Sequence, residues 1–178
     1  MVRILGSLMV IAGLVAASPA AKDKDKGATP EDRVTKEVRH ELITLPFYSV
    51  FDNLAYRVDG GRVTLFGQVH TPELKSDAQR SVQKIEGVTG VDNEIEVLPT
   101  SINDDQLRHV LFRAIYGRGD LSRYAEGAVP PIHIIVKNGN VTLEGVVANQ
   151  MDKQLAEMAA KQVSGVFGVT NNLRLDAK

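Results

Sequence analysis

The chain has 178 residues, a formal net charge of −1 and 43% hydrophobic residues, enough to pack one ordinary domain or two small ones. It contains no cysteine, which excludes disulfides, thiolate nucleophiles, cysteine-ligated metals and the lipid-modified cysteine of lipoproteins. The near-neutral charge, the lack of tryptophan and the 5% aromatic content argue against nucleic acid as a partner.

The first twenty residues have the pattern of a secretory signal peptide. Arg3 is the only charge before an apolar run over residues 4–17, and the small residues Ser18 and Ala20 precede the favoured cleavage point. The run is shorter than the roughly 20 residues that a membrane-spanning helix needs, so a retained anchor is the weaker alternative. We therefore expect residues 1–20 to be removed on export, and residues 21–30 to form a polar linker.

The rest of the chain is an internal duplication. Residues 61–97 align with 139–175 at a constant shift of 78 without a gap, and 13 of the 37 aligned positions are identical. Further upstream the apolar pattern aligns at a shift of 73, so the second copy carries about five additional residues between its first helix and first strand. We expect two structural units, at residues 31–99 and 103–178.

Each unit has the periodicity of a helix, two strands, a second helix and a third strand. In the first unit these elements fall at about 34–45, 54–58, 63–69, 71–85 and 91–97. A strand-helix-strand step of this length makes the third strand parallel to the second. The predicted fold class is α+β, with two tandem α-β-β-α-β units, each a mixed three-stranded sheet with two helices on one face.

Glycine and asparagine residues mark turns and strand interruptions in the two units. Asn138 and Gly139 supply the two positive φ angles of a tight type I′ turn in the second hairpin. Glycine also stands in mid-strand, at positions 67 and 145, where a missing side chain allows a neighbouring strand or helix to approach. Asn93 and Asn171 interrupt an apolar alternation, and we expect their amides to hold main-chain groups.

The glycine and asparagine strings carry a family resemblance. Residues 61–67 with 87–93, and 139–145 with 165–171, resemble the signature of the BON domain. A signal peptide followed by two such units is similar to the osmotically inducible periplasmic proteins of Gram-negative bacteria. The resemblance implies a non-catalytic periplasmic module that associates with phospholipid surfaces and supports tolerance of osmotic or envelope stress. Without a lipid-anchored N-terminal cysteine, any membrane attachment would be reversible.

Motifs for catalysis or for metal binding are absent from the sequence. There is no serine in a nucleophile elbow, no phosphate-binding glycine loop and no H-E-x-x-H string. The four histidines, His40, His70, His109 and His133, fall on unmatched positions of the two units and lack zinc-ligand spacing. We expect no enzymatic activity, no cofactor and no bound metal.

Charge separates the two units and points to a lipid-binding surface on the second. Residues 31–99 carry 8 basic and 12 acidic side chains, whereas residues 104–178 carry 9 and 8. The second unit is therefore the better candidate for contact with an anionic phospholipid membrane surface. The candidate residues in and near its longer loop are Arg113, Arg118, Leu121, Arg123 and Tyr124. A solubilising surface around a long insertion is the alternative interpretation.

A second functional class is a protein- or peptidoglycan-binding scaffold in the cell envelope. Its contact patch for envelope proteins would be Phe47, Tyr48 and Phe51, which follow the first helix. These aromatics also fit a role in covering the sheet edge of their own unit, because a unit of about 70 residues has little core to spare. The short join over residues 99–103 favours contact between the two units.

The signal-peptide interpretation predicts that the mature protein begins at or near Ala21. Intact-mass measurement on protein exported from a Gram-negative host should give a mass lacking residues 1–20. Recovery of exported protein with Met1 still present would contradict it.

Overall fold

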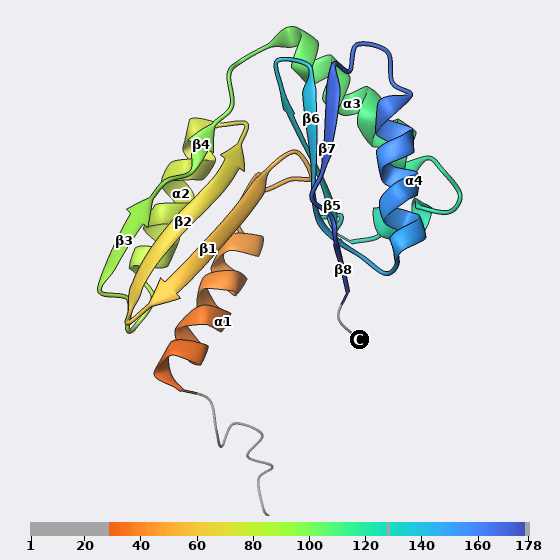
Figure 1. The fold of residues 1–178 in the computed structure, drawn as a ribbon. Helices are drawn as coiled ribbons and strands as arrows, with labels where there is room; N and C mark the ends of the chain where they lie inside the picture. The colour runs from red at the N-terminus through yellow and green to blue at the C-terminus, as the bar shows by residue number, and fades with distance from the viewer. Residues whose placement is uncertain (1–28, 128, 177–178) are drawn as a thin grey trace, which may run out of the picture.

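The computed structural model describes residues 29–127 and 129–176, so the expected signal peptide and most of the expected linker lie outside the described residues. Two units of similar design follow each other along the chain and lie side by side (Figure 1). Among the described helices, none is both long and apolar enough to cross a membrane.

Both units contain the elements expected from the sequence, in the expected order. The first unit consists of α1 (Pro30–Ile43), β1 (Asn53–Asp59), β2 (Arg62–Val69), α2 (Pro72–Gln83), β3 (Gly90–Asn93) and β4 (Glu96–Val97). The second consists of α3 (Ile102–Tyr116), a short 3-10 helix η1 (Ser122–Ala125), β5 (Ile132–Lys137), β6 (Asn140–Val147), α4 (Gln150–Lys161), β7 (Gly168–Asn171) and β8 (Arg174–Leu175). The α+β class with two repeated units is confirmed.

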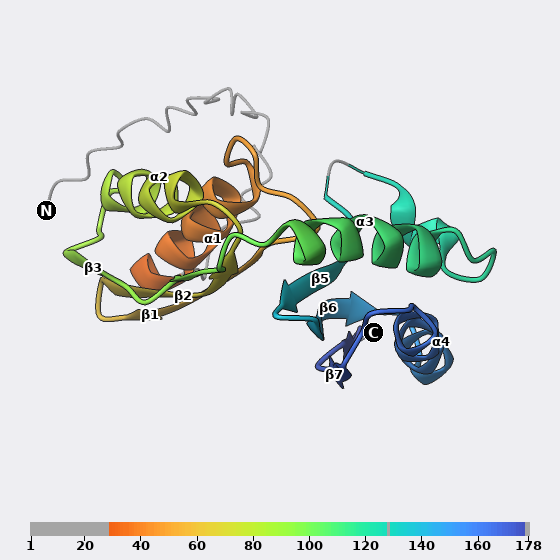
Figure 2. The same cartoon turned by 90° about the horizontal axis from the view of Figure 1, so that it is seen from above.

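Each sheet is mixed, and its third strand is interrupted. β1 pairs antiparallel with β2, and β2 pairs in parallel with both β3 and β4, which lie along the same side of it. The second unit repeats this arrangement with β5, β6, β7 and β8. Both helices of the first unit cover one face of its sheet (Figure 2). The expected third strand is therefore present as two short pieces.

The interruption of the third strand is caused by the asparagine that recurs in both units. The Asn93 side-chain amide donates to the carbonyl of Lys75 on α2 at 3.0 Å, while its oxygen accepts from the N–H of Ile95 at 3.2 Å. Asn171 makes the same two contacts, with the carbonyl of Lys153 at 2.9 Å and the N–H of Leu173 at 3.2 Å. The expectation that these amides hold main-chain groups is confirmed.

The second strand of each unit, β2 and β6, needs a glycine in its middle, because the main chain at the start of the preceding strand lies very close to it. Gly67 and Gly145 have φ angles of 114° and 117°, which side-chain-bearing residues rarely adopt. A Cβ atom at Gly67 would lie 2.1 Å from the carbonyl oxygen of Asn53, and one at Gly145 would lie 1.9 Å from that of Pro131. The close approach expected from sequence is thus to the beginning of the adjacent strand.

Helix capping and turn chemistry fix the ends of the elements. Thr29 and Asp32 form a reciprocal capping box at the start of α1, so the last two residues of the expected linker are the N-cap and the first residue of this helix. Asn138 and Gly139 have φ angles of 52° and 74°, as a type I′ turn requires. Their two N–H groups donate to the buried carboxylate of Asp104 at 2.8 and 2.9 Å, which ties α3 to the second hairpin.

Each unit has its own apolar core between sheet and helices. The core of the first unit consists of Val34, Val38, Leu42, Leu45, Val63, Leu65, Val69, Leu74, Ala78, Val82 and Ile95. The larger core of the second includes Leu111, Ile115, Leu121, Ile134, Leu143, Ala156 and Leu173, together with Val50 from the first unit. Val50 therefore belongs to one unit by sequence and to the other by packing.

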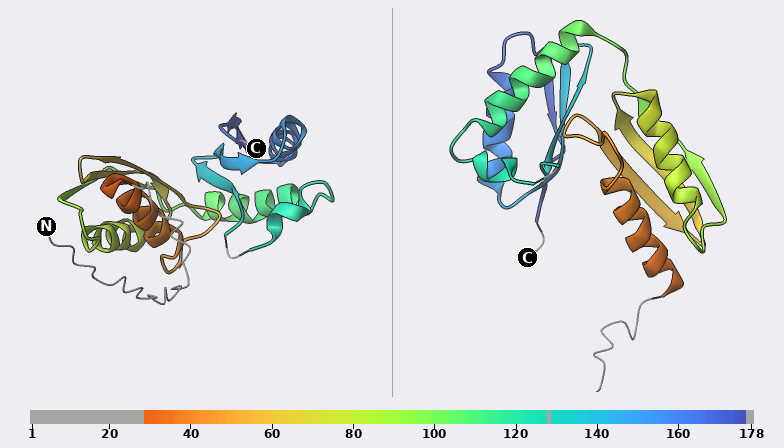
Figure 3. Two further views of the ribbon diagram at one scale, coloured as in Figure 1. Left: turned by 90° about the horizontal axis from the view of Figure 1, so that it is seen from below. Right: turned by 180° about the vertical axis from the view of Figure 1, so that it is seen from behind.

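The two units are joined by the loop between α1 and β1, which we call the docking loop (residues 44–52). It leaves the first unit and lies against β5 (Figure 3). The main-chain N–H of Ile134 on β5 donates to the carbonyl of Val50 at 2.8 Å. An ion pair of 2.5 Å between Lys137 and Glu96 adds a second link between the units. The expected contact between the units is therefore present.

Val50 offers a direct test of this packing. Because its side chain is buried in the core of the second unit, Val50→Ala should lower the free energy of unfolding by about 2 kcal/mol. Amide hydrogen exchange should quicken in β5 and α3. The matched change Val34→Ala, in the core of the first unit, should quicken exchange in α1 and β2 instead. Faster exchange confined to the first unit in the Val50→Ala protein would contradict the assignment.

Candidate functional site

The loop that was expected to insert into lipid is held in the core by Leu121. The side chain of Leu121 is 0% exposed and packs among the apolar residues of the second unit. Its N–H also donates to the carbonyl of Arg118 at 3.0 Å. Leu121 is thus a core residue, and its assignment as an inserting side chain is wrong in this conformation. The cause is the small size of the unit, which uses the apolar residue of its longest loop to fill the core.

Arg123 and Tyr124 are engaged with a buried carboxylate. Arg123 forms an ion pair with Asp152, whose side chain is almost fully buried at the start of α4. The Tyr124 hydroxyl donates to the same carboxylate at 2.6 Å and accepts from the N–H of Ala148 at 2.8 Å. Hydrogen bonding to Tyr124 and Asp152 raises the pKa of the Arg123 guanidinium further. Both residues attach η1 to α4, which leaves Tyr124 little freedom to enter a membrane.

Arg113 and Arg118 remain on the surface of the second unit. Arg113 is exposed on the last turn of α3, and Arg118 follows in the loop, partly exposed, with Gln162 at the end of α4 3.5 Å from its guanidinium. Both therefore lie where the end of α3 meets the end of α4. Of the five candidates, Arg113, Arg118 and Arg123 keep the solvent exposure that a head-group contact needs, but Arg123 is engaged in its ion pair with Asp152.

The structure shows an exposed apolar patch next to α3 that the sequence pattern did not reveal. Phe167 is 82% exposed in the turn between α4 and β7, and its ring lies against Gly139, where a Cβ would be 2.7 Å from it. Val110 on α3 is 40% exposed. Phe167, Val110 and Leu107 line one depression of about 590 Å³. We call Phe167 and Val110, with Arg113 and Arg118, the α3–α4 surface.

A signal for Phe167 does exist in the duplicated sequence. At the shift of 78, Phe167 aligns with Thr89, so an aromatic residue in the second unit replaces a polar one in the first. Comparing the two copies for such changes, rather than for identities, would have singled out this position. Arg113 lies one helical turn beyond Val110, which places a charge beside the apolar patch.

The expected aromatic contact patch is divided by the structure. Phe47 is 84% exposed with a φ angle of 67°, whereas Tyr48 stacks on His133 with ring centroids 5.7 Å apart. Phe51 packs edge-on against His109 and Phe112. Phe51 covers the sheet edge of the other unit, because the docking loop carries it onto the second core, whereas Tyr48 packs against the core of its own unit as well as on His133. Tyr48 and Phe51 are therefore inter-unit contacts rather than a free patch.

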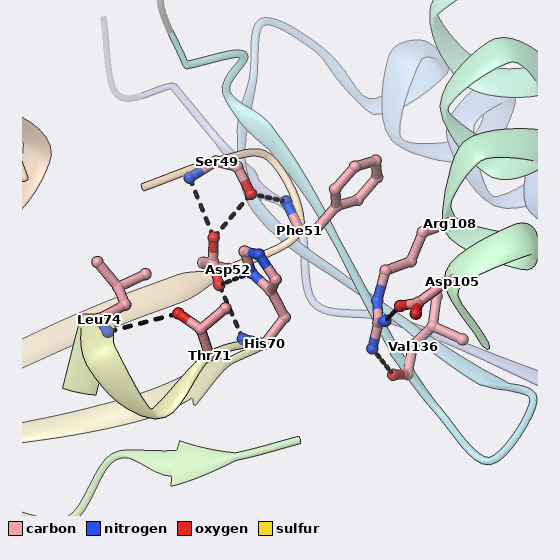
Figure 4. Close-up of polar contacts among 9 residues, drawn as sticks. All are labelled: Ser49, Phe51, Asp52, His70, Thr71, Leu74, Asp105, Arg108 and Val136. Atoms are coloured by element: carbon pink, nitrogen blue, oxygen red, sulfur yellow. Dashed lines mark hydrogen bonds and ion pairs between the residues drawn. The ribbon is translucent and has the colours of Figure 1, made fainter. Parts of the chain in front are cut away.

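A polar network fixes the docking loop at its base (Figure 4). The buried carboxylate of Asp52 accepts from the N–H and the hydroxyl of Ser49, at 3.0 and 2.7 Å. Its other oxygen lies 2.9 Å from the N–H of His70 and 2.6 Å from Nδ1 of the same residue. Across the junction, Arg108 pairs with Asp105 and donates to the carbonyl of Val136 at 2.8 Å.

The junction shifts the pKa values of two histidines in opposite directions. The hydrogen bond to Asp52 raises the pKa of His70, while burial lowers the pKa of His133. Nδ1 of His133 is buried without a hydrogen-bond partner among the described residues. Burial also raises the pKa of Tyr48 to about 12, so its hydroxyl stays protonated in the stack on His133. Within residues 29–127 and 129–176, no three metal-ligating side chains gather into a cluster.

The two histidines should give the protein a stability maximum near their ordinary pKa of about 6.5. The contribution of His70 is present below that value and is lost as pH rises through its raised pKa. The contribution of His133 is lost as pH falls below its ordinary pKa, because the unfolded chain then binds a proton that the folded chain resists.

Thermal unfolding between about pH 5 and 8.5 tests this balance. His133→Gln should flatten the acid side of the curve, and His70→Gln the alkaline side. His40→Gln, on the exposed end of α1, is the control and should leave the shape unchanged. The same flattening in both junction variants would show that the two histidines do not act separately.

Comparison with known proteins identifies one family. The family model described as "BON domain" matches residues 31–99 and 120–177. No curated protein has a detectable match. Among solved structures, CdsD, a structural protein of the type III secretion system of Chlamydia trachomatis, is 13% identical, with a TM-score of 0.33 over 81% of this chain and 92% of that one. The C-terminal domain of CdsD gives 13% and 0.28, over 80% and 96%. The chain belongs to the BON domain family, as a tandem pair of non-catalytic, envelope-associated modules.

Proposed function

We propose that this protein binds anionic phospholipid surfaces of the cell envelope weakly and reversibly, through the α3–α4 surface of its second unit, and so supports tolerance of osmotic or envelope stress. The proposal places the protein in the periplasm after removal of its signal peptide. The observation that carries it is the exposure of Phe167 and Val110, with Arg113 one helical turn beyond Val110 on α3 and Arg118 in the loop that follows. An apolar side chain next to basic ones is what an interfacial contact with anionic lipid requires.

The energetics of this surface predict weak binding. Two arginines near an anionic membrane contribute about 2 kcal/mol in total. Burial of the Phe167 side chain in the interface adds roughly 2 kcal/mol. The sum of about 4 kcal/mol corresponds to a dissociation constant near 1 mM. Binding of this strength is salt-sensitive and favours transient contact with a membrane that is present at high local concentration.

The scaffold alternative loses the patch on which it rested. Tyr48 and Phe51 are occupied by β5 and α3, which leaves Phe47 as the exposed aromatic of the three. A single exposed ring is a small contact area for a stable protein interface. The α3–α4 surface combines two exposed apolar side chains with two basic ones and is therefore the better-supported site.

Sedimentation of the mature protein with vesicles of anionic or zwitterionic lipid across a salt series tests the lipid site. Phe167→Ser should weaken binding to anionic vesicles several-fold at every ionic strength, because apolar insertion is insensitive to screening. The double variant Arg113→Gln with Arg118→Gln should weaken binding most at low salt. Thermal stability should change little in both, because the replaced side chains are exposed.

Two control variants separate the lipid site from general surface effects. Met151 is 62% exposed at the start of α4, away from the α3–α4 surface, so Met151→Ser should bind vesicles like the unchanged protein. Leu121→Ser should lower stability, since that side chain is in the core. Undiminished vesicle binding by Phe167→Ser and by the double arginine variant would overturn the proposed site.

A further inference from the structure

The first four residues of β1, 53–56, lie along a groove between the two units. β1 pairs with β2 alone among the described strands, so it is an edge strand over its full length. The groove has a volume of about 1350 Å³ and is lined by Leu54 and Tyr56 of β1 and, from the second unit, by Glu144 and Val146 of β6. An edge strand facing a groove of this size has room beside it for another extended segment.

The equivalent edge in the second unit already holds such a segment. The N–H of Ile134 on β5 points away from β6 and donates to the carbonyl of Val50 at 2.8 Å. The side chains of Tyr48 and Phe51, on either side of Val50, pack against His133 and Phe112. The molecule thus shows how this edge accepts a passing chain: one main-chain hydrogen bond, with flanking side chains packed beside it.

The same main-chain geometry is repeated on β1. Ile134 and Tyr56 are equivalent at the shift of 78, and they stand opposite the equivalent residues Leu143 and Leu65 in their hairpins. The N–H of Tyr56 therefore points outward like that of Ile134, and so does the N–H of Val58 two residues later. Neither N–H has a hydrogen-bond partner in the part of the chain that the structure describes.

Charge indicates what kind of segment fits. The charged residues that line the groove are Arg39, Glu94, Glu96, Glu144, Arg174 and Asp176, four acidic and two basic. Glu96 is already paired with Lys137 at the junction. Glu94, Glu144 and Asp176 leave an acidic excess over the two arginines. Electrostatic complementarity therefore favours a basic segment.

We propose that the β1 edge binds an extended, basic polypeptide segment of a partner protein as an added strand, with Lys or Arg side chains directed to Glu144 across the groove. Main-chain hydrogen bonds supply the affinity, and the acidic side chains supply the preference for basic residues. This site uses no residue of the α3–α4 surface, so a test of it does not depend on whether the protein binds lipid.

The direct test is amide hydrogen exchange of the full mature protein, followed by NMR, with an alternating lysine-valine heptapeptide as the probe. At saturation, exchange at Tyr56 and Val58 should slow at least tenfold, because added strands protect outward N–H groups. Exchange at Ala55 and Arg57, which face β2, should not change. A glutamate-valine heptapeptide is the charge control and should bind much more weakly.

Charge-reversal variants identify the groove. Glu144→Lys and Glu94→Lys should each weaken binding of the lysine-valine peptide about fivefold at low salt. Glu86→Lys, an exposed change outside the groove, is the matched control and should have no effect beyond that of net charge. Thermal unfolding checks that all three variants fold.

Three outcomes would overturn the proposal. The first is peptide binding that leaves exchange at Tyr56 unchanged, since the peptide would then lie elsewhere. The second is protection of Tyr56 that rises with protein concentration without peptide, which would assign the edge to a second copy of this chain. The third is absence of binding up to millimolar peptide. Vesicle binding could persist in all three cases.

Discussion

The main-chain hydrogen bond between Ile134 and Val50 is the contact on which the arrangement of the two units depends. It anchors the docking loop to β5, so Val50 enters the core of the second unit and the rings of Tyr48 and Phe51 settle on either side. An edge strand with unpaired N–H groups is an aggregation hazard, and here the first unit supplies the cover. The linkage also places His133 at the junction, where burial lowers its pKa.

The two copies share an inner design and differ in what they expose. Asn93 and Asn171 make equivalent contacts with the second helix, and Gly67 and Gly145 allow the same close approach of the first strand. These contacts are internal to each unit, so both copies need them. On the surface, by contrast, Phe167 of the second copy stands where the first has Thr89, and Arg113 and Arg118 belong to the second copy. This pattern favours different roles for the two copies. In our proposals, the second unit binds lipid and the edge of the first unit binds polypeptide.

The sequence sufficed for the elements because their signals are local. Helix caps, the Asn138–Gly139 turn and apolar periodicity act over a few residues. Because the sequence is duplicated, most of these signals can be compared between two copies. The predicted lipid-binding residues agree less well with the structure, because the solvent exposure of a side chain depends on tertiary packing. Leu121 in a long polar loop looks like an exposed side chain until the small core that it completes is known. Tyr124 could not be assigned without its partner Asp152, which lies 28 residues away.

The break in the third strand of each sheet has a consequence for assembly. Asn93 and Asn171 turn what would be a continuous edge into pieces of four and two residues, too short to template another chain. The opposite edge of the second sheet is closed by the docking loop. Among the described strands, β1 is therefore left as the long open edge. The other edges of the described sheets therefore offer little for another chain to pair with.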